Sequence, residues 1–520
     1  MQKNMPAATV PTQAKATPPD AITAGCARFI VDTRYEDLPE AALAIARRCM
    51  FDTCGLYVAG LHEQSTRVLA EFATEQGGAP QSRLLGGGGQ RVPATTAARV
   101  LGTSAHAHDF DDTQVSHDPK HVYGLLTHPS VPPLTAALVL ADAAQARGTA
   151  AVGWNELMRA FLVGFEVECK ISEWMPADHY LRGHHSSGTV GTFGAMAAAA
   201  CLLQLDEPQV RNAIGIAASF AAGIRCSFGT MTKPLHVGRA CENGVLAAQL
   251  AQKGFTADPD ALDGRWGFPA VLAGGFDSAK MHQGFGATWT IVDPGVSIKP
   301  YPSGILTHQT MDAMRALVID HDVRPEQVAQ VDLFAGDNII NPIRYPIAAN
   351  GLQAKFSMPA LLTMMVLFRD APIRAFEDGS VKTDAFQQMQ RKVRVHRDAE
   401  INAQGFDLIR SRVRITLVDG RVLEREADLR YRGGPLLPMT DQEMSAKFHA
   451  CTDALIDATA ADRLTSLLAG PTPPLADELM AILASARIPD RLRQGLPRDG
   501  QDEHASGAAA RGRRESERPR

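Results

Sequence analysis

Acidic residues and histidines crowd into one stretch of the chain, Ala105 to Ser130, which reads AHAHDFDDTQVSHDPKHVYGLLTHPS. Carboxylates this close together destabilise a fold unless a metal ion, a cationic pocket or water compensates for their charge. The flanking segments, 93–106 and 132–146, are rich in alanine and other apolar residues, which indicates packed helices rather than open surface. We therefore expect this stretch to form the floor of an active site.

Three further stretches combine basic and hydroxyl side chains: GHHSSGTVG at 183–191, TMTKPLHVG at 230–238 and IKPYPS at 298–303, the last followed by His308. Taken singly, each has an ordinary explanation, because a histidine in an alanine-rich segment is mostly a core or capping residue. Several of these stretches, however, lie at expected starts of apolar helices, where free N–H groups and the helix dipole favour an anion. Together they suit a substrate that carries several carboxylates.

General acid–base chemistry beside a carboxylate fits this set of side chains. It requires a group that takes up or gives a proton, and fixed cations that hold the carboxylates. Histidine and lysine can fill these roles near neutral pH.

Length and composition exclude several other classes of protein. With 520 residues, the chain is too long for one ordinary core, which predicts two domains or one domain with an insertion. A net charge of −5 and a pI near 6.4 favour neither nucleic acid nor a membrane surface as a partner. Without a long apolar run or a signal-peptide core, we expect a cytoplasmic protein with no membrane span. The cysteines form no C-x-x-C pair, which disfavours disulfides and an iron–sulfur cluster.

The periodicity of apolar residues predicts which elements position these stretches. Helices are predicted over 20–32, 37–60, 65–75, 93–108, 132–147, 154–175, 189–204, 207–222 and 234–253, and later over 305–320, 357–368, from 440 onward and over 475–486. Short β-like runs occur at 288–292, 295–298, 327–334 and 392–396. Alternating residues at 411–418 and 422–427 flank Asp419-Gly420 and predict a hairpin.

This order of elements predicts a mainly α fold in which an α+β segment is inserted into a helical protein. We expect a disordered leader at 1–19 and a disordered tail at 491–520. The helical domain is expected to combine 20–289 with 437–490, and the α+β domain to span 290–436.

Five motifs carry a resemblance to a known family: AHAHDFDDT with HPS downstream, GHHSSGTVGTFGAMAAAA, TKPLHVGRACENG, IKPYPSG and QAKFS. In this order, over roughly residues 20–490, the chain resembles the MmgE/PrpD family, which includes 2-methylcitrate dehydratase, cis-aconitate decarboxylase and iminodisuccinate epimerase. The resemblance implies a helical domain built from both chain ends, a smaller α+β lid domain and a homodimer. It also implies a small polycarboxylate substrate and catalysis with neither a metal nor another cofactor.

Residue by residue, the resemblance implies a catalytic set and a substrate-binding set. We expect His128 to be the main acid/base, Asp109 to tune it and fix its tautomer, His185 to assist proton transfer and Thr113 to orient the substrate. Counting back from Gly191 selects His185 rather than His184 for this position. The residues expected to bind the substrate are Lys233, Lys299, His308 and Ser130.

One departure from the family and several alternatives stay open. Fourteen residues separate Thr113 from His128, more than in several relatives, so the pocket rim should differ.

We favour dehydration of a 2-methylcitrate-like acid, with decarboxylation or epimerisation as alternatives in the same pocket. Rivals of other classes are a class II terpene cyclase, from the D-x-D-D-T pattern at 109–113, a non-enzymatic helical binding protein and a metal-dependent helical hydrolase. The hydrolase would use ligands from His106, His108, Asp109, Asp111, Asp112, His117 and His121.

Overall fold

The computed structural model describes residues 22–489, apart from 115–126, 150, 278–279, 282–283, 406–408, 454 and 471–472. The expected disordered ends, 1–19 and 491–520, and most of the long segment between Thr113 and His128 lie outside the described residues.

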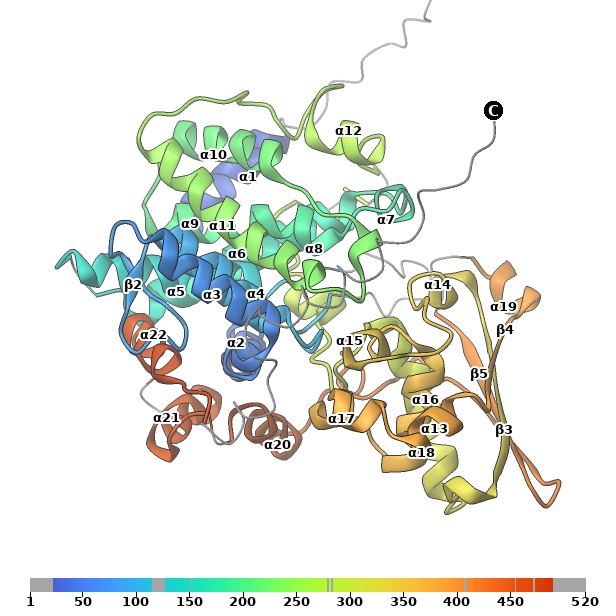
Figure 1. Ribbon diagram of the computed structural model, residues 1–520. Coiled ribbons are helices and arrows are strands. Elements are labelled where there is room, and N and C mark those ends of the chain that lie inside the picture. The colour runs from blue at the N-terminus through green and yellow to red at the C-terminus, as the bar shows by residue number, and fades with distance from the viewer. Residues whose placement is uncertain are drawn as a thin grey trace, which may run out of the picture.

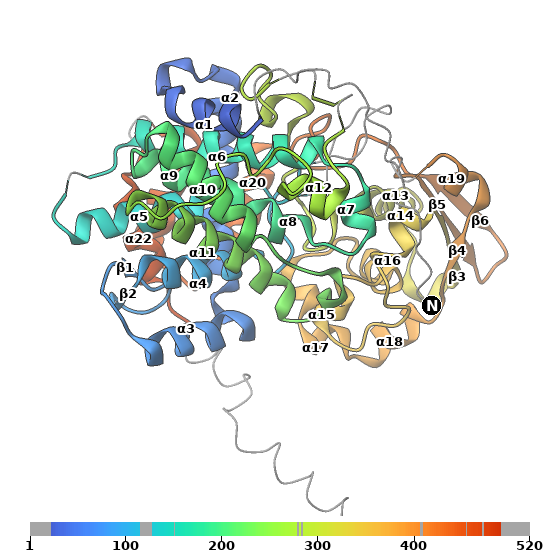
Figure 2. The ribbon, with the colours of Figure 1, turned by 90° about the horizontal axis from the view of Figure 1, so that it is seen from above.

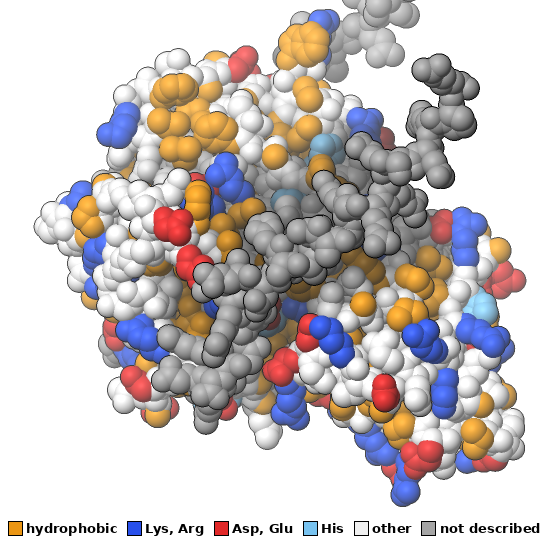
Figure 3. Space-filling view, viewed as in Figure 1, with side chains coloured by type: hydrophobic (Ala, Val, Ile, Leu, Met, Phe, Trp, Pro, Cys, Tyr) orange, Lys and Arg blue, Asp and Glu red, His pale blue; other side chains and the backbone are white. Residues whose placement is uncertain are grey.

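The fold is mainly α, as predicted (Figure 1). In the described part of the chain, no helix combines the length and apolar character needed to cross a membrane. Acidic and basic side chains are interspersed on the face shown in Figure 3, in keeping with the small net charge.

Most of the molecule is a multilayer arrangement of helices around α9 and α11, which contact α4, α5, α6 and α10 (Figure 1). Two short strands, β1 Ser82–Arg83 and β2 Arg91–Val92, form a small hairpin beside it. The helices of this part are α1 Ile22–Asp32, α2 Glu40–Ala59, α3 Gln64–Gln76, α4 Ala94–His106, α5 Val131–Ala146, α6 Trp154–Trp174, α7 Asp178–Leu181, α8 Ser186–Thr189, α9 Gly191–Leu202, α10 Glu207–Phe220, α11 Thr232–Gln252 and α12 Phe268–Ala273.

Small residues let these helices approach closely. Helix α9 reads GTFGAMAAAACL and is buried on nearly all sides, so alanine rather than large side chains fills the space around it. At the crossing of α4 and α11, a Cβ atom on Gly238 would lie 2.1 Å from Oγ1 of Thr103 and 2.3 Å from the carbonyl oxygen of Arg99. Glycine is therefore required at this crossing, which holds α11 against α4.

The last helices of the chain return to the first. Helices α20 Asp441–Thr452, α21 Ala458–Ala469 and α22 Ala476–Ser485 lie against α2 and α5 (Figure 1). The ring centroids of Phe51 and Phe448 are 4.5 Å apart, and Nζ of Lys447 lies 2.7 Å from Oδ1 of Asp52 in the interior. Both chain ends thus contribute to one apolar core.

The segment between these two helical parts is an α+β unit at one edge of the molecule (Figure 2). Its sheet has the order β4-β3-β5-β6, with β3 parallel to β4 and antiparallel to β5. Helices α13 and α16 contact the sheet and separate it from the helical part. Its elements are α13 His308–Asp320, β3 Val328–Ala335, α14 Asp337–Ile340, α15 Gly351–Ala354, α16 Met358–Phe368, α17 Asp378–Val381, α18 Asp384–Gln390, β4 Val393–Arg397, α19 Ala399–Ala403, β5 Ser411–Leu417 and β6 Val422–Glu426.

The strands downstream of residue 327 were predicted within two residues, and the hairpin at Asp419-Gly420 is confirmed by the pairing of Thr416 with Val422. The predicted strand at 288–292 is wrong. There the backbone N–H groups of Thr290 and Gly286 donate to the carboxylate of Glu166, at 2.7 and 3.1 Å, and the chain turns through 291–295 instead. A buried side chain thus takes the donors that a strand would offer to a neighbour.

The crossing of α4 and α11 yields a stability prediction. Gly238→Ala should lower the free energy of unfolding by about 1–3 kcal/mol, because overpacking outweighs the gain in helix propensity. Gly25→Ala on α1 is the matched control: no atom lies within 4 Å of its added Cβ, so it should be neutral or stabilising by up to about 1 kcal/mol. Chemical denaturation of both variants measures the difference. A Gly238→Ala protein as stable as the wild type would contradict the close crossing.

Candidate active site

Five of the eight predicted site residues meet in a pocket between the helical part and the α+β unit. These five, which we call the floor, are Asp109, Thr113, His128, His185 and Lys233. The other lining residues form an apolar wall: Gly304, Ile305, Leu306, Pro342, Ile343 and Phe356, together with Tyr180 and Phe228. A larger hollow of about 1120 Å³ lies near α10 and α12, but none of its described lining residues is a histidine or a lysine.

Helix ends and one short pairing position the floor. Asp109 follows the last turn of α4 and has a φ of +54°, a conformation that aspartate tolerates better than most residues. Thr113 pairs with Ser297 through two backbone hydrogen bonds of 2.9 Å. His128 lies just before α5, and Lys233 lies in the first turn of α11. Segments far apart in sequence therefore converge on one point.

Asp109 is a buried carboxylate between two ammonium groups. Its Oδ1 atom lies 2.8 Å from Nζ of Lys299 and 3.2 Å from Nζ of Lys233. Burial by itself would raise the pKa of Asp109, but the ammonium groups of Lys233 and Lys299 offset it and hold that pKa well below its usual range. The group is therefore ionised at neutral pH and fixes both lysines.

A second carboxylate, Asp111, bridges two histidines. Its Oδ2 atom lies 2.8 Å from Nδ1 of His106 and 3.3 Å from Nδ1 of His128. Burial opposes ionisation of Asp111, but the two imidazoles offset it and hold its pKa well below the usual range. Because an ionised carboxylate only accepts hydrogen bonds, both rings carry a proton on Nδ1. The sequence assigned the tautomer of His128 to Asp109, which instead lies 3.9 Å from the opposite nitrogen, Nε2.

This tautomer of His106 in turn orients Lys233. With its proton on Nδ1, His106 accepts through Nε2 from Nζ of Lys233 at 2.8 Å. Burial lowers the pKa of Lys233, an effect that the charge of Asp109 opposes. The chain of contacts from Asp111 through His106 to Lys233 therefore holds an ammonium group at the pocket.

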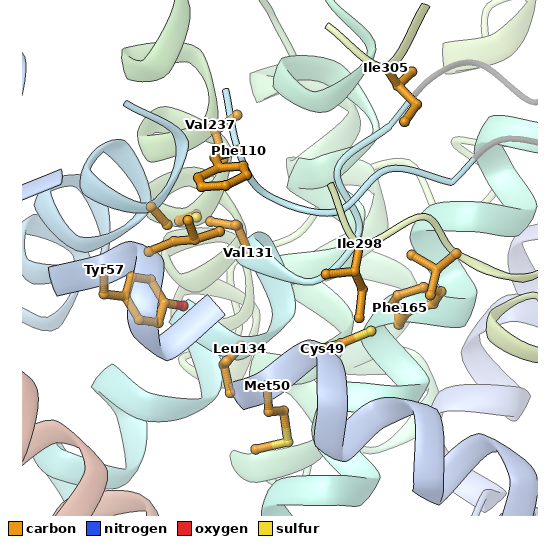
Figure 4. Packing of buried hydrophobic residues seen from close by; sticks show 14 of the residues in the cluster. Cys49, Met50, Tyr57, Phe110, Val131, Leu134, Phe165, Val237, Ile298 and Ile305 are labelled. Carbon is orange, nitrogen blue, oxygen red and sulfur yellow. The ribbon is translucent and has the colours of Figure 1, made fainter. Parts of the chain in front are cut away.

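Phe110 lies between these two carboxylates in sequence and points away from the pocket. Figure 4 shows its ring among the buried apolar side chains of the core. Its carbonyl oxygen accepts from Nζ of Lys447 at 2.9 Å, and the same ammonium group lies 4.0 Å from its ring centroid. This anchoring turns Asp109 and Asp111 toward the lysines and histidines.

Three predicted substrate-binding residues lie behind the pocket and do not line it. Lys299 is fully buried and donates to both the carboxylate and the carbonyl oxygen of Asp109. Ser130 donates its hydroxyl to the carboxylate of Asp112. His308 packs edge-on against Tyr301, with Nε2 3.3 Å from the carbonyl oxygen of Ser303. Lys299 therefore supports Asp109, which lines the pocket, whereas the partners of Ser130 and His308 do not line it. Direct contact of these three residues with a substrate stays a prediction.

The neighbouring histidines 184 and 185 differ sharply in their surroundings. His185 is buried and lines the pocket, at the position that the family register selects. His184 is only partly buried and stacks on His179, with ring centroids 4.7 Å apart. Its backbone pairs with Ile224, so it supports the loop beside the pocket.

Four of the candidate metal ligands lie close together. The possible ligand atoms of His106, Asp109, Asp111 and His128 are within 4.8 Å of one another. A cation among them would also lie against the ammonium group of Lys233, which is 2.8 Å from His106 and 3.2 Å from Asp109. That arrangement suits a structural ion network better than a metal. The candidate ligands His117 and His121 lie outside the described residues.

Sequence reasoning missed His106 and Asp111 as members of the site and considered them only as metal ligands. Their signal was present in the motif AHAHDFDDT, but spacing alone does not reveal which carboxylate faces which imidazole. Three aromatic residues that line the pocket were also missed. Tyr180 and Phe228 lie outside the quoted motifs, whereas Phe356 lies inside QAKFS but was not singled out as a pocket residue.

Burial of His308 yields a prediction about pH. Burial lowers the pKa of His308 to about 3, against about 6.5 in an unfolded chain. Between these values the unfolded chain binds a proton that the folded protein does not, so stability falls as pH is lowered from 6.5. From pH 7 to pH 5 the wild type should lose about 1–2 kcal/mol more than His308→Gln.

Denaturation at both pH values measures this difference. His321→Gln, a change of an exposed histidine at the other end of α13, should leave the wild-type slope unchanged. Equal slopes for the wild type and His308→Gln would show that His308 is not held neutral.

The chain is similar to known proteins over most of its length. The chain is 26% identical to the cis-aconitate decarboxylase of Homo sapiens over 480 residues, which covers 87% of this chain and 96% of the human protein. The cis-aconitate decarboxylase of Mus musculus is also 26% identical over 478 residues (87% and 94% covered), and that of Aspergillus terreus is 23% identical over 478 residues (86% and 93% covered).

The family itself follows from two domain matches. The MmgE/PrpD N-terminal domain matches residues 25–280, and the MmgE/PrpD C-terminal domain matches residues 301–469. These two ranges contain the floor and the apolar wall of the pocket, and together they cover well over half of the chain. The chain belongs to the MmgE/PrpD family.

Proposed function

We propose that this protein is a lyase that acts on a small polycarboxylate without a metal or another cofactor. The observation that supports this most is the convergence of Asp109, His128, His185 and Lys233 on one buried pocket. The pocket offers a fixed ammonium group and two imidazoles, which are the groups needed to hold a carboxylate and to move a proton.

Among the reactions of the family, we favour decarboxylation of a cis-aconitate-like tricarboxylate over dehydration. The sequence alone favoured dehydration of a 2-methylcitrate-like acid, but the relatives named above are all cis-aconitate decarboxylases. The lining of the pocket also favours decarboxylation over dehydration. Its apolar wall includes Ile305, Leu306 and Ile343, and the ammonium group of Lys233 lines the same pocket. A carboxylate held against such a wall becomes neutral CO₂ as it leaves, so low polarity there favours its loss.

The proposed reaction balances with one proton. The bond between the leaving carboxylate and its carbon breaks, and its electron pair forms a new double bond. The electron pair of the old double bond takes up a proton at the far carbon, so a tricarboxylate and one proton give a dicarboxylate and CO₂. His128 or His185 donates this proton, while Lys233 holds a remaining carboxylate and Thr113 orients it.

Dehydration remains the second candidate, because two imidazoles on one floor could serve as base and acid for a hydroxy acid. The cyclase alternative is disfavoured by charge. Such chemistry needs a protonated aspartic acid in the pocket, whereas Asp109 and Asp111 have pKa values well below the usual range. Burial raises the pKa of Asp112 to about 7, but Asp112 bonds to Ser130 and does not line the pocket.

Three further expectations stay proposals. We propose that the α+β unit acts as a lid over the helical floor, because it supplies most of the apolar wall. A homodimer, expected from the family, would be detected by light scattering of the purified protein. The cytoplasmic location expected from the sequence would be tested by fractionation.

A substrate panel followed by NMR tests the proposed reaction. The panel contains cis-aconitate, 2-methylcitrate, citrate and related hydroxy acids, and the protein is first dialysed against a chelator. We expect cis-aconitate to give new alkene signals and CO₂, with one deuteron incorporated per product in D₂O. Alkene formation from 2-methylcitrate alone would establish the dehydratase instead.

Two other outcomes would contradict a metal-free lyase. Activity that is lost on chelation and restored by a divalent ion would support the hydrolase-like metal site. No turnover and no thermal stabilisation by any di- or tricarboxylate would support the binding protein.

The role of His128 is tested by its removal. His128→Ala should lower kcat by about 10²- to 10⁴-fold, the usual worth of general acid–base catalysis, with a smaller change in KM. His184→Ala is the control, because His184 does not line the pocket, and it should keep kcat within about threefold of the wild type. A loss of less than about tenfold for a folded His128→Ala protein would overturn the assignment.

A further inference from the structure

A second histidine, His236, lies directly behind His185. The two Nδ1 atoms are 3.0 Å apart, a hydrogen-bond distance, and the ring centroids are 5.2 Å apart. His236 does not line the pocket, and it lies one turn after Lys233 on α11. It is therefore placed to act on a pocket residue through a single contact.

Two glycines leave room for His236 beside His185. A Cβ atom on Gly188 would lie 3.1 Å from Cβ of His236, and one on Gly223 would lie 3.3 Å from its Cγ, so a larger residue at either position would crowd the ring. The carbonyl oxygen of Gly223 also accepts from the backbone N–H of His185, at 3.0 Å. The segment around Gly223 therefore contacts both histidines.

Both imidazoles are neutral at neutral pH. Burial, followed by the charge of Lys233, lowers the pKa of His236 to about 4 and that of His185 well below its usual range. His106 and His128 are the other titratable groups that act on His185, and they act in the same direction. Two neutral rings that meet through their Nδ1 atoms share one proton: one Nδ1 donates and the other accepts.

A bound anion decides which ring donates. Nδ1 of His185 faces His236, so Nε2 is the nitrogen left for a ligand in the pocket. A carboxylate can only accept, so it favours His185 with the proton on Nε2. We propose that His236 is a positioning residue that donates from its own Nδ1 to Nδ1 of His185 and thereby keeps the proton of His185 on Nε2, facing the substrate.

This inference rests on the proposed function, because it takes an anionic substrate as the ligand. It explains why a neutral histidine can serve a pocket for carboxylates: the hydrogen bond, rather than a positive charge, orients its proton. Removal of His236 would leave Nδ1 of His185 buried without a hydrogen-bond donor. The tautomer of His185 with its proton on Nδ1 would then compete with the tautomer that carries it on Nε2.

Two substitutions of His236 separate this role from simple packing. Asparagine places an amide near the position of Nδ1 and can donate, whereas leucine fills the space and cannot. We expect His236→Asn to keep kcat on cis-aconitate within about threefold of the wild type, and His236→Leu to lose about 10- to 100-fold in kcat with a smaller change in KM. His321→Asn and His321→Leu, on the exposed end of α13, are the matched controls and should behave as wild type.

A double-mutant cycle tests whether His236 acts through His185. His185→Leu combined with His236→Leu should have the kcat of His185→Leu alone, because the second change removes a partner that is already lost. Additive losses would overturn the inference, as would wild-type kcat in His236→Leu or equal losses in His236→Asn and His236→Leu. Thermal unfolding of each variant shows whether it is folded.

The proton itself can be located without turnover. In protein labelled with ¹⁵N-histidine and saturated with propane-1,2,3-tricarboxylate, a saturated analogue, we expect His185 protonated on Nε2 and His236 on Nδ1. A proton on Nδ1 of His185 would overturn the inference even if His236→Leu failed to fold. A wild type that turns over none of the panel would instead count against the proposed lyase, so the two failures are distinguishable.

Discussion

The site depends on one carboxylate that is held ionised in the protein interior. Asp109 is nearly inaccessible to water, and the ammonium groups of Lys233 and Lys299 make its charge tolerable there. The attraction acts in both directions, because each lysine needs the same carboxylate. These partners come from three separate stretches of the chain, so the ion cluster also joins α11 and the start of the α+β unit to the end of α4.

A second set of contacts orients the polar groups of the floor. Asp111 sets the tautomers of His106 and His128, and His106 passes that setting to Lys233 through a hydrogen bond of 2.8 Å. Charge is thus balanced within the protein before any ligand arrives. His106 and Lys233 are therefore oriented before any ligand binds, and in enzymes such fixed polar groups need not reorganise during the reaction.

The sequence was sufficient to predict the broad fold and the residues that line the floor. The periodicity of apolar residues indicates the helices, and the order of the motifs indicates the floor residues, without any knowledge of the structure. It was insufficient where a side chain, rather than a neighbouring strand, accepts the backbone hydrogen bonds, as the carboxylate of Glu166 does near residue 290. It also chose Asp109 rather than Asp111 as the carboxylate that fixes the tautomer of His128, because spacing in the sequence does not show which carboxylate faces Nδ1. Only the left-handed backbone at Asp109 and the anchoring of Phe110 decide which imidazole each one faces.

The pairing of Gln114 with Thr127 has a consequence for how this family can diverge. Their backbones meet at 3.0 Å, so the chain leaves the floor after Thr113 and returns just before His128 at nearly the same place. The separation of these two residues in space is therefore independent of the length of the excursion between them. The number of residues between Gln114 and Thr127 can therefore change while Thr113 and His128 keep their places on the floor of the pocket.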